Sequence, residues 1–506
     1  MNIFWFRRDL RLRDNSALFD LLKFDECGVV YIHDITLQSQ DDFSSLHRDF
    51  IDESLYDLSK NFIDCGGFLN IYEGESVEIF RSLISTYNIQ RVYTNSEIGS
   101  KPIRDRDLVL EKLFNSYRIK WLVYQNNGVV GRLKNRDGWS EKWNKKMYRP
   151  IIQDVNTSRT KRLEIDRSES ISYKSKIYKV AHQKRYEGGE KNGHDQLSYF
   201  LNSSGKTYSS DISSPLRSEK SCSRLSAYLT FGNLSIRQII QATRNRQTEL
   251  RELKSRDGWL KSLSAFSSRL RWHCHFIQKL EMQPDLEYTN MVRAFDGMRD
   301  SHSEILFNAW KNGRTGYPMV DACMRFLKKT GWINFRMRAM LVSFASYNLW
   351  LDWRATSKYL SRYFLDYEPG IHYNQFQMQS GVTGINTIRI YNPVKQSYEH
   401  DKKGVFIKKY VPELVSLPEQ WVHEPHRMSA ELCQRFGVII GKDYPYPIVD
   451  NTAGIREAKN KMAEHRRHPE FGAIAASIYQ KLGSRSRPPA SRKPKPVQSR
   501  QQLSLF

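Results

Sequence analysis

The chain has 506 residues, of which 40% are hydrophobic and 12% aromatic. This length exceeds one ordinary core, so we expect two or three domains, and the apolar content excludes global disorder. The 79 Lys and Arg residues outnumber the 55 Asp and Glu residues, which gives a net charge of +24. Such a charge favours a polyanionic partner, nucleic acid first and an anionic membrane surface second, while a soluble basic protein with solvated lysines stays open.

The six cysteines show no CxxC pair and no metal-ligand spacing, so we expect neither a disulfide framework nor a bound metal. No segment approaches the ~20 apolar residues of a membrane span, and the N-terminal apolar run is too short for a signal peptide. These observations predict a protein of a reducing, cytoplasmic compartment without a membrane partner.

The first 130 residues alternate short apolar runs with amphipathic stretches at 54–65 and 77–87. This alternation is typical of a parallel sheet covered by helices. The segments expected to be strands are 2–6, 28–33, 67–72, 91–95 and 119–124. We therefore predict an α/β domain over 1–130, without the GxGxxG or GxxxxGK[ST] loops of dinucleotide or triphosphate sites.

Residues 131–194 are polar and basic with little periodicity, which predicts an interdomain linker on the surface. Helical spacing dominates from residue 195 onward, so the second domain, 195–482, is expected to be all helical. The stretches with this spacing are 235–253, 259–281, 319–329 and 334–353. The last stretch, 483–506, has six cations, four prolines and no acid, and we expect a disordered basic tail that either attracts phosphates or only solubilises the chain.

Two segments stand out from this background. Residues 5–15 read WFRRDLRLRDN and run from the first expected strand into a loop crowded with arginine and aspartate, which indicates a salt-bridged turn. Residues 313–325 read GRTGYPMVDACMR and lead to TGW at 330–332. Four shorter motifs occur elsewhere in the chain. SRLS at 223–226 precedes this segment, and RMR at 336–338, DWR at 352–354 and RIYNP at 389–393 come after it. In these segments the chain resembles the photolyase/cryptochrome family over roughly its first 415 residues.

The resemblance implies a Rossmann-like antenna domain joined to an all-helical domain that holds FAD, with light-driven electron transfer as the activity. It also implies an antenna chromophore, folate or deazaflavin, between which no motif in residues 1–130 discriminates. The hydroxyls and the cation of 221–226 suit a diphosphate, although they also suit a helix cap. The residues expected to bind FAD are Tyr208, Cys222, Ser223, Arg224, Leu225, Ser226, Arg338, Asp366, Glu368 and His372.

Three of these residues have expected roles. Arg338 lies in an apolar stretch where a buried guanidinium demands an acid, and Asp366 is the natural candidate. In the family such a pair stabilises the negative charge of the reduced flavin, although it equally makes a core salt bridge. Glu368 stands where the family has Asp. Counting from Asp366 places His372 opposite flavin N5, where an imidazole that titrates near neutrality tunes flavin protonation or simply bonds a helix end.

The substrate side departs from the family. Trp272, His273 and His275 share one expected helix, and we expect aromatic faces to stack on unpaired bases there. Arg269 stands where the repair members have a glutamate that contacts the dimer. The residues expected to contact DNA are Arg269, Trp272, His273 and Arg336, and those expected to be catalytic are Trp353, His372 and Trp272.

The tryptophan chain of the family is interrupted. Phe376 takes the flavin-proximal position and is too hard to oxidise, Trp353 matches the middle member, and no Trp occurs near Asp300 at the outer position. Another route is open through aromatic residues that are otherwise ordinary core rings. These residues are Trp310, Trp332, Tyr347, Trp350 and Tyr373.

The expected function is light-driven, FAD-dependent repair of pyrimidine dimers in DNA, the reaction of a carbon–carbon lyase. The alternative is a cryptochrome-type blue-light photoreceptor with a protein partner. A third, weaker hypothesis is a flavin-bearing nucleic-acid binder without photochemistry. Arg269, Phe376 and the tail favour the photoreceptor, whereas the net charge, Trp272 and Arg336 favour repair.

Overall fold

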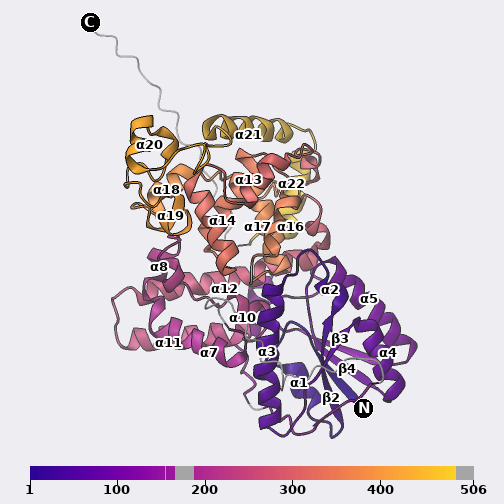
Figure 1. Cartoon of the computed structure of the whole chain (residues 1–506). Helices are drawn as coiled ribbons and strands as arrows, with labels where there is room; N and C mark the ends of the chain where they lie inside the picture. Colours follow the sequence, from indigo (N-terminus) through magenta and orange to yellow (C-terminus); the bar gives the residue numbers. More distant parts are fainter. Residues whose placement is uncertain (154, 166–186, 486–506) are drawn as a thin grey trace, which may run out of the picture.

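The structure is a computed structural model that describes residues 1–153, 155–165 and 187–485. The predicted basic tail lies outside the described residues from 486 onward. The chain forms an α/β domain and a larger helical domain, as predicted (Figure 1). No helix among the described residues combines the length and the apolar character needed to cross a bilayer.

A parallel sheet in the order β3-β2-β1-β4-β5 forms the first domain. All five strands were predicted from their apolar runs, with bounds within about three residues. A sixth, two-residue strand, which was not predicted, pairs with β2. The strands are β1 (Asn2–Phe6), β2 (Cys27–Asp34), β3 (Asn70–Gly74), β4 (Arg91–Asn95), β5 (Lys120–Tyr124) and β6 (Thr160–Lys161).

The two faces of the sheet pack against different partners because side chains alternate along a strand. On β1, Ile3 and Trp5 belong to a core under α4 and α5, whereas Phe4 and Phe6 point to the other face. The core on that second face continues into the helical domain, so the domains share one apolar interior. The helices of this domain are α1 (Ser16–Leu21), α2 (Ile35–Gln38), α3 (Ser45–Asp64), α4 (Ser76–Thr86) and α5 (Lys101–Ser116).

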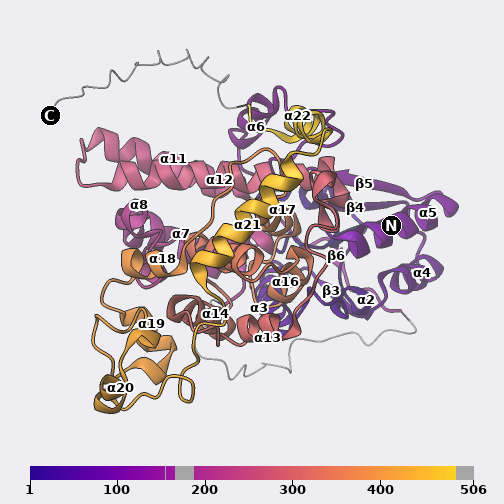
Figure 2. The ribbon, with the colours of Figure 1, turned by 90° about the horizontal axis from the view of Figure 1, so that it is seen from above.

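The segment predicted as a surface linker contains β6 and the helix α6 (Trp139–Met147). Trp139, Trp143 and Met147 are buried, four residues apart on one face of this helix. These three residues are the only apolar ones in the helix, so the polar average composition of the segment hides their helical spacing. The helix lies beside α22 (Phe471–Leu482), as Figure 2 shows.

The helical domain is built around α12, which packs against α11 on one side and α17 on another (Figure 2). Its longer helices are α7 (Glu190–Asn202), α11 (Ile236–Glu252), α12 (Trp259–Met282), α13 (Glu304–Lys311), α14 (Pro318–Thr330), α15 (Phe335–Ser343), α16 (Trp353–Ser361), α17 (Pro369–Ser380), α18 (Pro393–His400) and α21 (Asn451–Arg466). The shorter elements are α8 (Tyr208–Asp211), α9 (Ser218–Ser221), α10 (Ser226–Thr230), α19 (Val405–Tyr410), α20 (Ala430–Phe436), η1 (Ser204–Thr207), η2 (Pro284–Glu287), η3 (Arg293–Phe295), η5 (Pro412–Leu414) and η6 (Pro425–Arg427).

The helical stretch predicted at 334–353 is interrupted. After α15 the chain makes a π-helical turn, η4 (Phe344–Asn348), and Trp350 then adopts a left-handed backbone with φ of 54°. A bulky residue with positive φ is uncommon and ends a helix. The break lets α16 start in a new direction at Trp353.

The charged loop after β1 joins the domains. The Leu10 backbone N–H donates to the Phe231 carbonyl over 3.1 Å, and the Arg11 guanidinium donates to the Gly232 carbonyl over 2.9 Å. Gly232 has φ of +74°, and a Cβ there would lie 2.3 Å from the Arg8 carbonyl oxygen, so this approach requires glycine. The loop contains ion pairs, as predicted, and it also binds the helical domain through these hydrogen bonds to backbone carbonyls.

Candidate functional site

A cavity of about 290 Å³ opens within the helical domain. Its walls come from α12, α15 and α17, and from the segments that precede α10, α15 and α17. Twelve residues that the sequence singled out line it, which are Tyr208, Cys222, Ser223, Arg224, Ser226, Arg269, Trp272, His273, Arg338, Asp366, Glu368 and His372. Leu225, Arg336 and Trp353 are the predicted site residues that do not line it.

The turn between α9 and α10 presents polar groups to the cavity. Arg224 has φ of 57°, a left-handed conformation that costs a non-glycine residue roughly 1–2 kcal/mol. This turn brings Ser223, Arg224 and Ser226 to the wall, while Leu225 between them is buried in the core. The Arg224 guanidinium lies 3.7 Å from the ring centre of Trp332. Hydroxyls and a guanidinium at this wall suit an anionic diphosphate.

Arg338 and Asp366 form the predicted ion pair. Arg338 donates from Nη2 to Asp366 Oδ2 over 2.8 Å and from Nε to the Ile333 carbonyl over 2.8 Å. Burial alone would raise the pKa of Asp366, but Arg338 and the contact with Ser226 hold it below its ordinary value. The carboxylate is therefore ionised at neutral pH, and its partner stands at the cavity wall as a fixed positive charge.

Glu368 immediately precedes α17 and points to the junction of the two domains. Its Oε2 lies 3.6 Å from Nη1 of Arg8 in the α/β domain. Burial raises the pKa of Glu368 above its ordinary value, although Arg8 opposes this effect. The glutamate at a position where the family has aspartate therefore reaches an arginine of the other domain.

His372 lies one turn into α17, and its Nε2 is 2.9 Å from the Ser357 carbonyl. Its ring packs against Phe376 and Tyr367, with centroids 4.5 and 5.0 Å away. Burial lowers the pKa of His372 to about 3. The expectation that this imidazole titrates near neutrality is therefore wrong, because it stays neutral at physiological pH with Nε2–H donating to the Ser357 carbonyl.

The residues at the cavity fit FAD. Four buried acceptor atoms on its walls have no hydrogen-bond partner among the described residues, and these are Oδ1 of Asn334, Oδ1 of Asp366, Oε1 of Glu368 and Oε1 of Gln375. Unpaired buried acceptors are costly unless a ligand supplies donors. FAD carries such donors on its flavin ring, ribityl chain and adenine, and the guanidinium group of Arg224 complements its diphosphate.

The mouth of the cavity carries an aromatic residue and a cation from α12. Trp272 is 43% exposed, and the Arg269 guanidinium lies 4.3 Å from its ring centre. His273 lines both the FAD cavity and a polar cavity of about 50 Å³ between the domains, and burial lowers its pKa to about 4. Arg336 lies off the cavity, 5.5 Å from the ring of Tyr391. The predicted DNA contacts are thus split, with only Arg269 and Trp272 together at the mouth.

Trp353 is buried behind the cavity wall. Its Nε1–H donates to Asn290 Oδ1 over 2.8 Å, and its ring centre lies 6.5 Å from that of Tyr373. The residues that sequence reasoning missed at the cavity include Asn334, Tyr367 and Gln375. Each of these residues lies within a few positions of a predicted site residue. Their residue types are also common in cores and helices, so the sequence does not show that they border the cavity.

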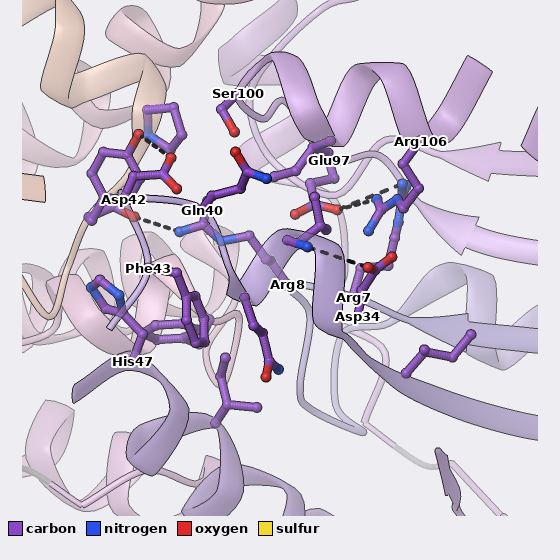
Figure 3. Close-up of a pocket in the computed structure, with 18 of the residues that line it drawn as sticks. Arg7, Arg8, Asp34, Gln40, Asp42, Phe43, His47, Glu97, Ser100 and Arg106 are labelled. Carbon is purple, nitrogen blue, oxygen red and sulfur yellow. Dashed lines mark hydrogen bonds and ion pairs between the residues drawn. The ribbon is translucent and has the colours of Figure 1, made fainter. Parts of the chain in front are cut away.

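A second pocket of about 140 Å³ lies where the sheet meets the helical domain (Figure 3). Arg7, Asp34 and Glu97 come from the carboxyl ends of strands, the edge at which ligands bind in open parallel sheets. Arg106 of α5 pairs with Glu97 over 3.2 Å, and Asp42 and Phe43 stand on the opposite side. Tyr367 lines both this pocket and the cavity.

Comparisons with known proteins agree with this arrangement. Residues 2–135 match the family model described as DNA photolyase, and residues 266–464 match the FAD binding domain of DNA photolyase. A deoxyribodipyrimidine photo-lyase of Alkalihalophilus pseudofirmus is 27% identical over 474 residues, which cover 90% of this chain and 96% of that protein. A cryptochrome DASH of Gloeobacter violaceus is 27% identical over 491 residues, 92% and 96% of the two chains.

A solved structure shares the fold. The archaeal photolyase from Sulfolobus tokodaii, solved with two FAD molecules, superposes with a TM-score of 0.71 at 24% identity and covers 92% of this chain and 100% of that one. Both kinds of relative, photolyases and cryptochromes, extend over nearly the whole chain. The chain therefore belongs to the photolyase/cryptochrome family, and its helical domain is an FAD-binding domain.

Proposed function

We propose that the chain is a cytoplasmic DNA photolyase that repairs pyrimidine dimers with light and FAD. The observation that carries this proposal is the mouth of the FAD cavity, where an exposed Trp272 and the Arg269 guanidinium stand side by side. FAD, when bound and reduced, supplies the electron that splits a dimer under light. The protein has to bring the two linked pyrimidines, extruded from the DNA helix, to that cofactor and hold them there.

The residues at the mouth suit this task. An exposed indole stacks on bases that have left the helix, which is worth about 1–3 kcal/mol per base. Arg269 donates hydrogen bonds where repair relatives have an acceptor, and the carbonyl oxygens of pyrimidines accept them. The guanidinium also attracts the phosphates, and the net charge of +24 supports binding to DNA.

The residues inside the cavity hold charge and exclude water. The positive charge of Arg338, fixed by Asp366, stabilises an anionic ring beside it. His372 is neutral and already bonded to the Ser357 carbonyl, so it positions its neighbours without adding charge. The second pocket, at the carboxyl ends of the strands, is the proposed place of an antenna chromophore, folate or deazaflavin.

The alternative is a cryptochrome-type photoreceptor with a protein partner. Two features favour it, Arg269 in place of the glutamate and Phe376 in place of the flavin-proximal tryptophan. The deciding experiment irradiates the FAD-loaded, dithionite-reduced protein with single-stranded and duplex DNA that contains dimers, with a dark sample as control. Loss of dimers supports repair. Dimers that persist after irradiation of the reduced protein contradict the proposed enzyme, and light-driven flavin reduction in a separate, oxidised sample of that protein then supports the photoreceptor.

A further inference from the structure

The oxidisable rings at the FAD cavity differ in the charge beside them. Four such rings line it among the described residues, and these are Tyr208, Trp272, Trp332 and Tyr367. Arg224 faces Trp332 at 3.7 Å, and Arg269 faces Trp272 at 4.3 Å and also contacts Tyr208. A guanidinium repels the positive charge that forms when a ring loses an electron, so these three rings are poor donors.

Tyr367 has a different environment, because a carboxylate meets its hydroxyl and the nearby Arg8 guanidinium bonds its backbone carbonyl rather than facing its ring. Its hydroxyl donates to Oδ2 of Asp42 over 2.9 Å, and its oxygen lies 3.1 Å from that of Tyr373. A phenol has one proton to donate, and an ionised carboxylate can only accept a hydrogen bond. Tyr367 therefore donates its proton to Asp42, and the hydroxyl of Tyr373 donates to the Tyr367 oxygen. Asp42 stands on the wall of the interdomain pocket, as Figure 3 shows.

We propose that Tyr367 is the electron donor from which light-excited, oxidised FAD is reduced, and that Asp42 accepts the phenolic proton. The O–H bond of Tyr367 breaks, its electron passes to the flavin, and its proton forms an O–H bond on the Asp42 carboxylate. A neutral tyrosyl radical and a carboxylic acid are left. An external thiolate then gives one electron to the tyrosyl radical and becomes a thiyl radical, while Asp42 returns the proton to the tyrosine oxygen.

The geometry of proton transfer supports this assignment. A base must lie within about 2.6–3.2 Å of the group whose proton it takes, and Asp42 does. The phenol is only 8% exposed, so bulk water has little access to it. Because the ring lines the FAD cavity while its hydroxyl is bonded to a residue of the other pocket, the electron and the proton leave in different directions.

A path for the radical continues behind the cavity. The Tyr373 ring lies 6.4 Å from Tyr367, and the two hydroxyl oxygens lie 3.1 Å apart. Transfer of the Tyr373 proton and an electron to the Tyr367 radical moves the unpaired electron away from the flavin and slows recombination. Trp350 is a poor alternative, because Arg299 at 4.5 Å and Lys461 at 4.9 Å both face its ring.

The inference goes beyond dimer repair, since photoreduction serves a photolyase and a photoreceptor alike; it rests on FAD binding. The test uses the full-length, FAD-loaded protein under blue light with a thiol and follows bleaching of oxidised flavin. Tyr367→Phe is compared with Tyr363→Phe, whose ring packs on Tyr359 and does not line the cavity. Asp42→Asn is compared with Asp41→Asn, which pairs with Lys358.

Tyr367→Phe and Asp42→Asn are expected to slow bleaching by about tenfold or more, and the two control variants are expected to match the wild type. Wild-type bleaching should also slow in D2O, and Asp42→Asn should lose that isotope effect. A Tyr367→Phe protein that holds FAD and bleaches at the wild-type rate overturns the proposal. An Asp42→Asn protein that keeps both rate and isotope effect overturns the role of Asp42.

A second readout needs no variant. Illuminated wild-type protein, frozen and examined by electron paramagnetic resonance, should show a neutral tyrosyl signal that narrows when the tyrosine rings are deuterated. A tryptophanyl signal in its place contradicts the proposal. Failure here is distinct from failure of the repair function, because the dithionite-reduced protein tests dimer loss without any photoreduction step.

Discussion

Arg8 of the α/β domain lies 3.6 Å from Glu368 of the helical domain, Nη1 to Oε2. The same guanidinium donates to the Tyr367 carbonyl over 2.6 Å and to the Thr230 carbonyl over 3.1 Å. One arginine of the loop after β1 thus fixes the segment that carries Asp366, Tyr367 and Glu368. The position of the FAD cavity wall depends on the contact between the domains.

Replacing Arg8 should therefore affect both stability and the cofactor. In Arg8→Met the Glu368 carboxylate stays buried without its cation, and we expect a loss of about 2–4 kcal/mol in the free energy of unfolding, with weaker FAD binding. Urea denaturation and flavin titration measure the two effects. The double variant with Glu368→Gln should recover part of the stability, since no buried charge remains. Additive losses in the double variant would contradict the coupling.

A second prediction concerns the ion pair at the cavity. Asp366→Asn leaves the guanidinium of Arg338, whose side chain is 25% exposed, without its anion. We expect about tenfold weaker FAD binding and a loss of about 2 kcal/mol in the free energy of unfolding, less than for a fully buried pair because solvent screens Arg338. Glu413→Gln is the matched control, because its pair with Arg325 at 2.7 Å lies away from the cavity. Flavin retention after gel filtration and urea denaturation give the comparison. Equal FAD affinity in both variants would contradict the assignment.

The ion pair between Arg338 and Asp366 also predicts that the protein loses stability at acidic pH. The pKa of Asp366 in the folded protein lies below its ordinary value. The unfolded chain therefore binds the proton more readily, so the stabilisation is complete above the ordinary carboxyl pKa and is lost as the pH falls through the folded pKa. The Asp366→Asn protein should lose this part of the pH dependence in urea denaturation at acidic pH.

The most recognisable motif proved to be structural. In the GRTGYPMVDACMR segment, the Asp321 carboxylate accepts bonds from the Thr315 N–H at 2.8 Å and the Thr315 hydroxyl at 2.7 Å, and also from Tyr444. None of these residues lines the FAD cavity or the two smaller ones described above. In this chain the segment therefore forms a buried turn that Asp321 holds together through its hydrogen bonds.

The features that could be predicted from the sequence are those that depend on local patterns or on the chemistry of single residues. Strands were found because alternation and apolar runs are local patterns, and the Arg338–Asp366 pair was found because a guanidinium in an apolar helix needs an acid. The Tyr367–Asp42 contact joins residues 325 positions apart and has no local signal. The neutral state of His372 likewise depends on burial, which only the packing of α17 decides.

The mouth of the cavity gives a fourth prediction, which rests on the proposed repair function. Trp272→Ala should weaken binding of dimer-containing DNA by about 1–3 kcal/mol while undamaged duplex changes little, because stacking needs an extruded base. Arg269→Ala should weaken binding to all DNA alike and reduce the slope of log K against log salt by about one. Fluorescence anisotropy at several salt concentrations measures both. Equal losses for damaged and undamaged DNA in Trp272→Ala would contradict the stacking role.

Lys279 on α12 gives the last prediction. It is 6% exposed and has no carboxylate partner among the described residues, and the groups that act on it are the Arg136 guanidinium and the surrounding apolar atoms. Burial, with a smaller effect of Arg136, lowers the pKa of Lys279 to about 8. An unfolded lysine titrates near 10.4, so between about pH 8 and 10.4 the unfolded chain binds more protons and the stability contributed by this group rises with pH.

Below pH 8 the charged ammonium in this position costs about 3 kcal/mol, so Lys279→Met should raise the free energy of unfolding at pH 7 by an amount of that order. The gain should shrink toward pH 10, where the wild-type lysine is already neutral in the folded protein. Lys261→Met, an exposed lysine of the same helix, should show no such trend. Urea denaturation at pH 7 and pH 10 provides the comparison, and a gain that is equal at both pH values would show that packing, not the buried charge, is responsible.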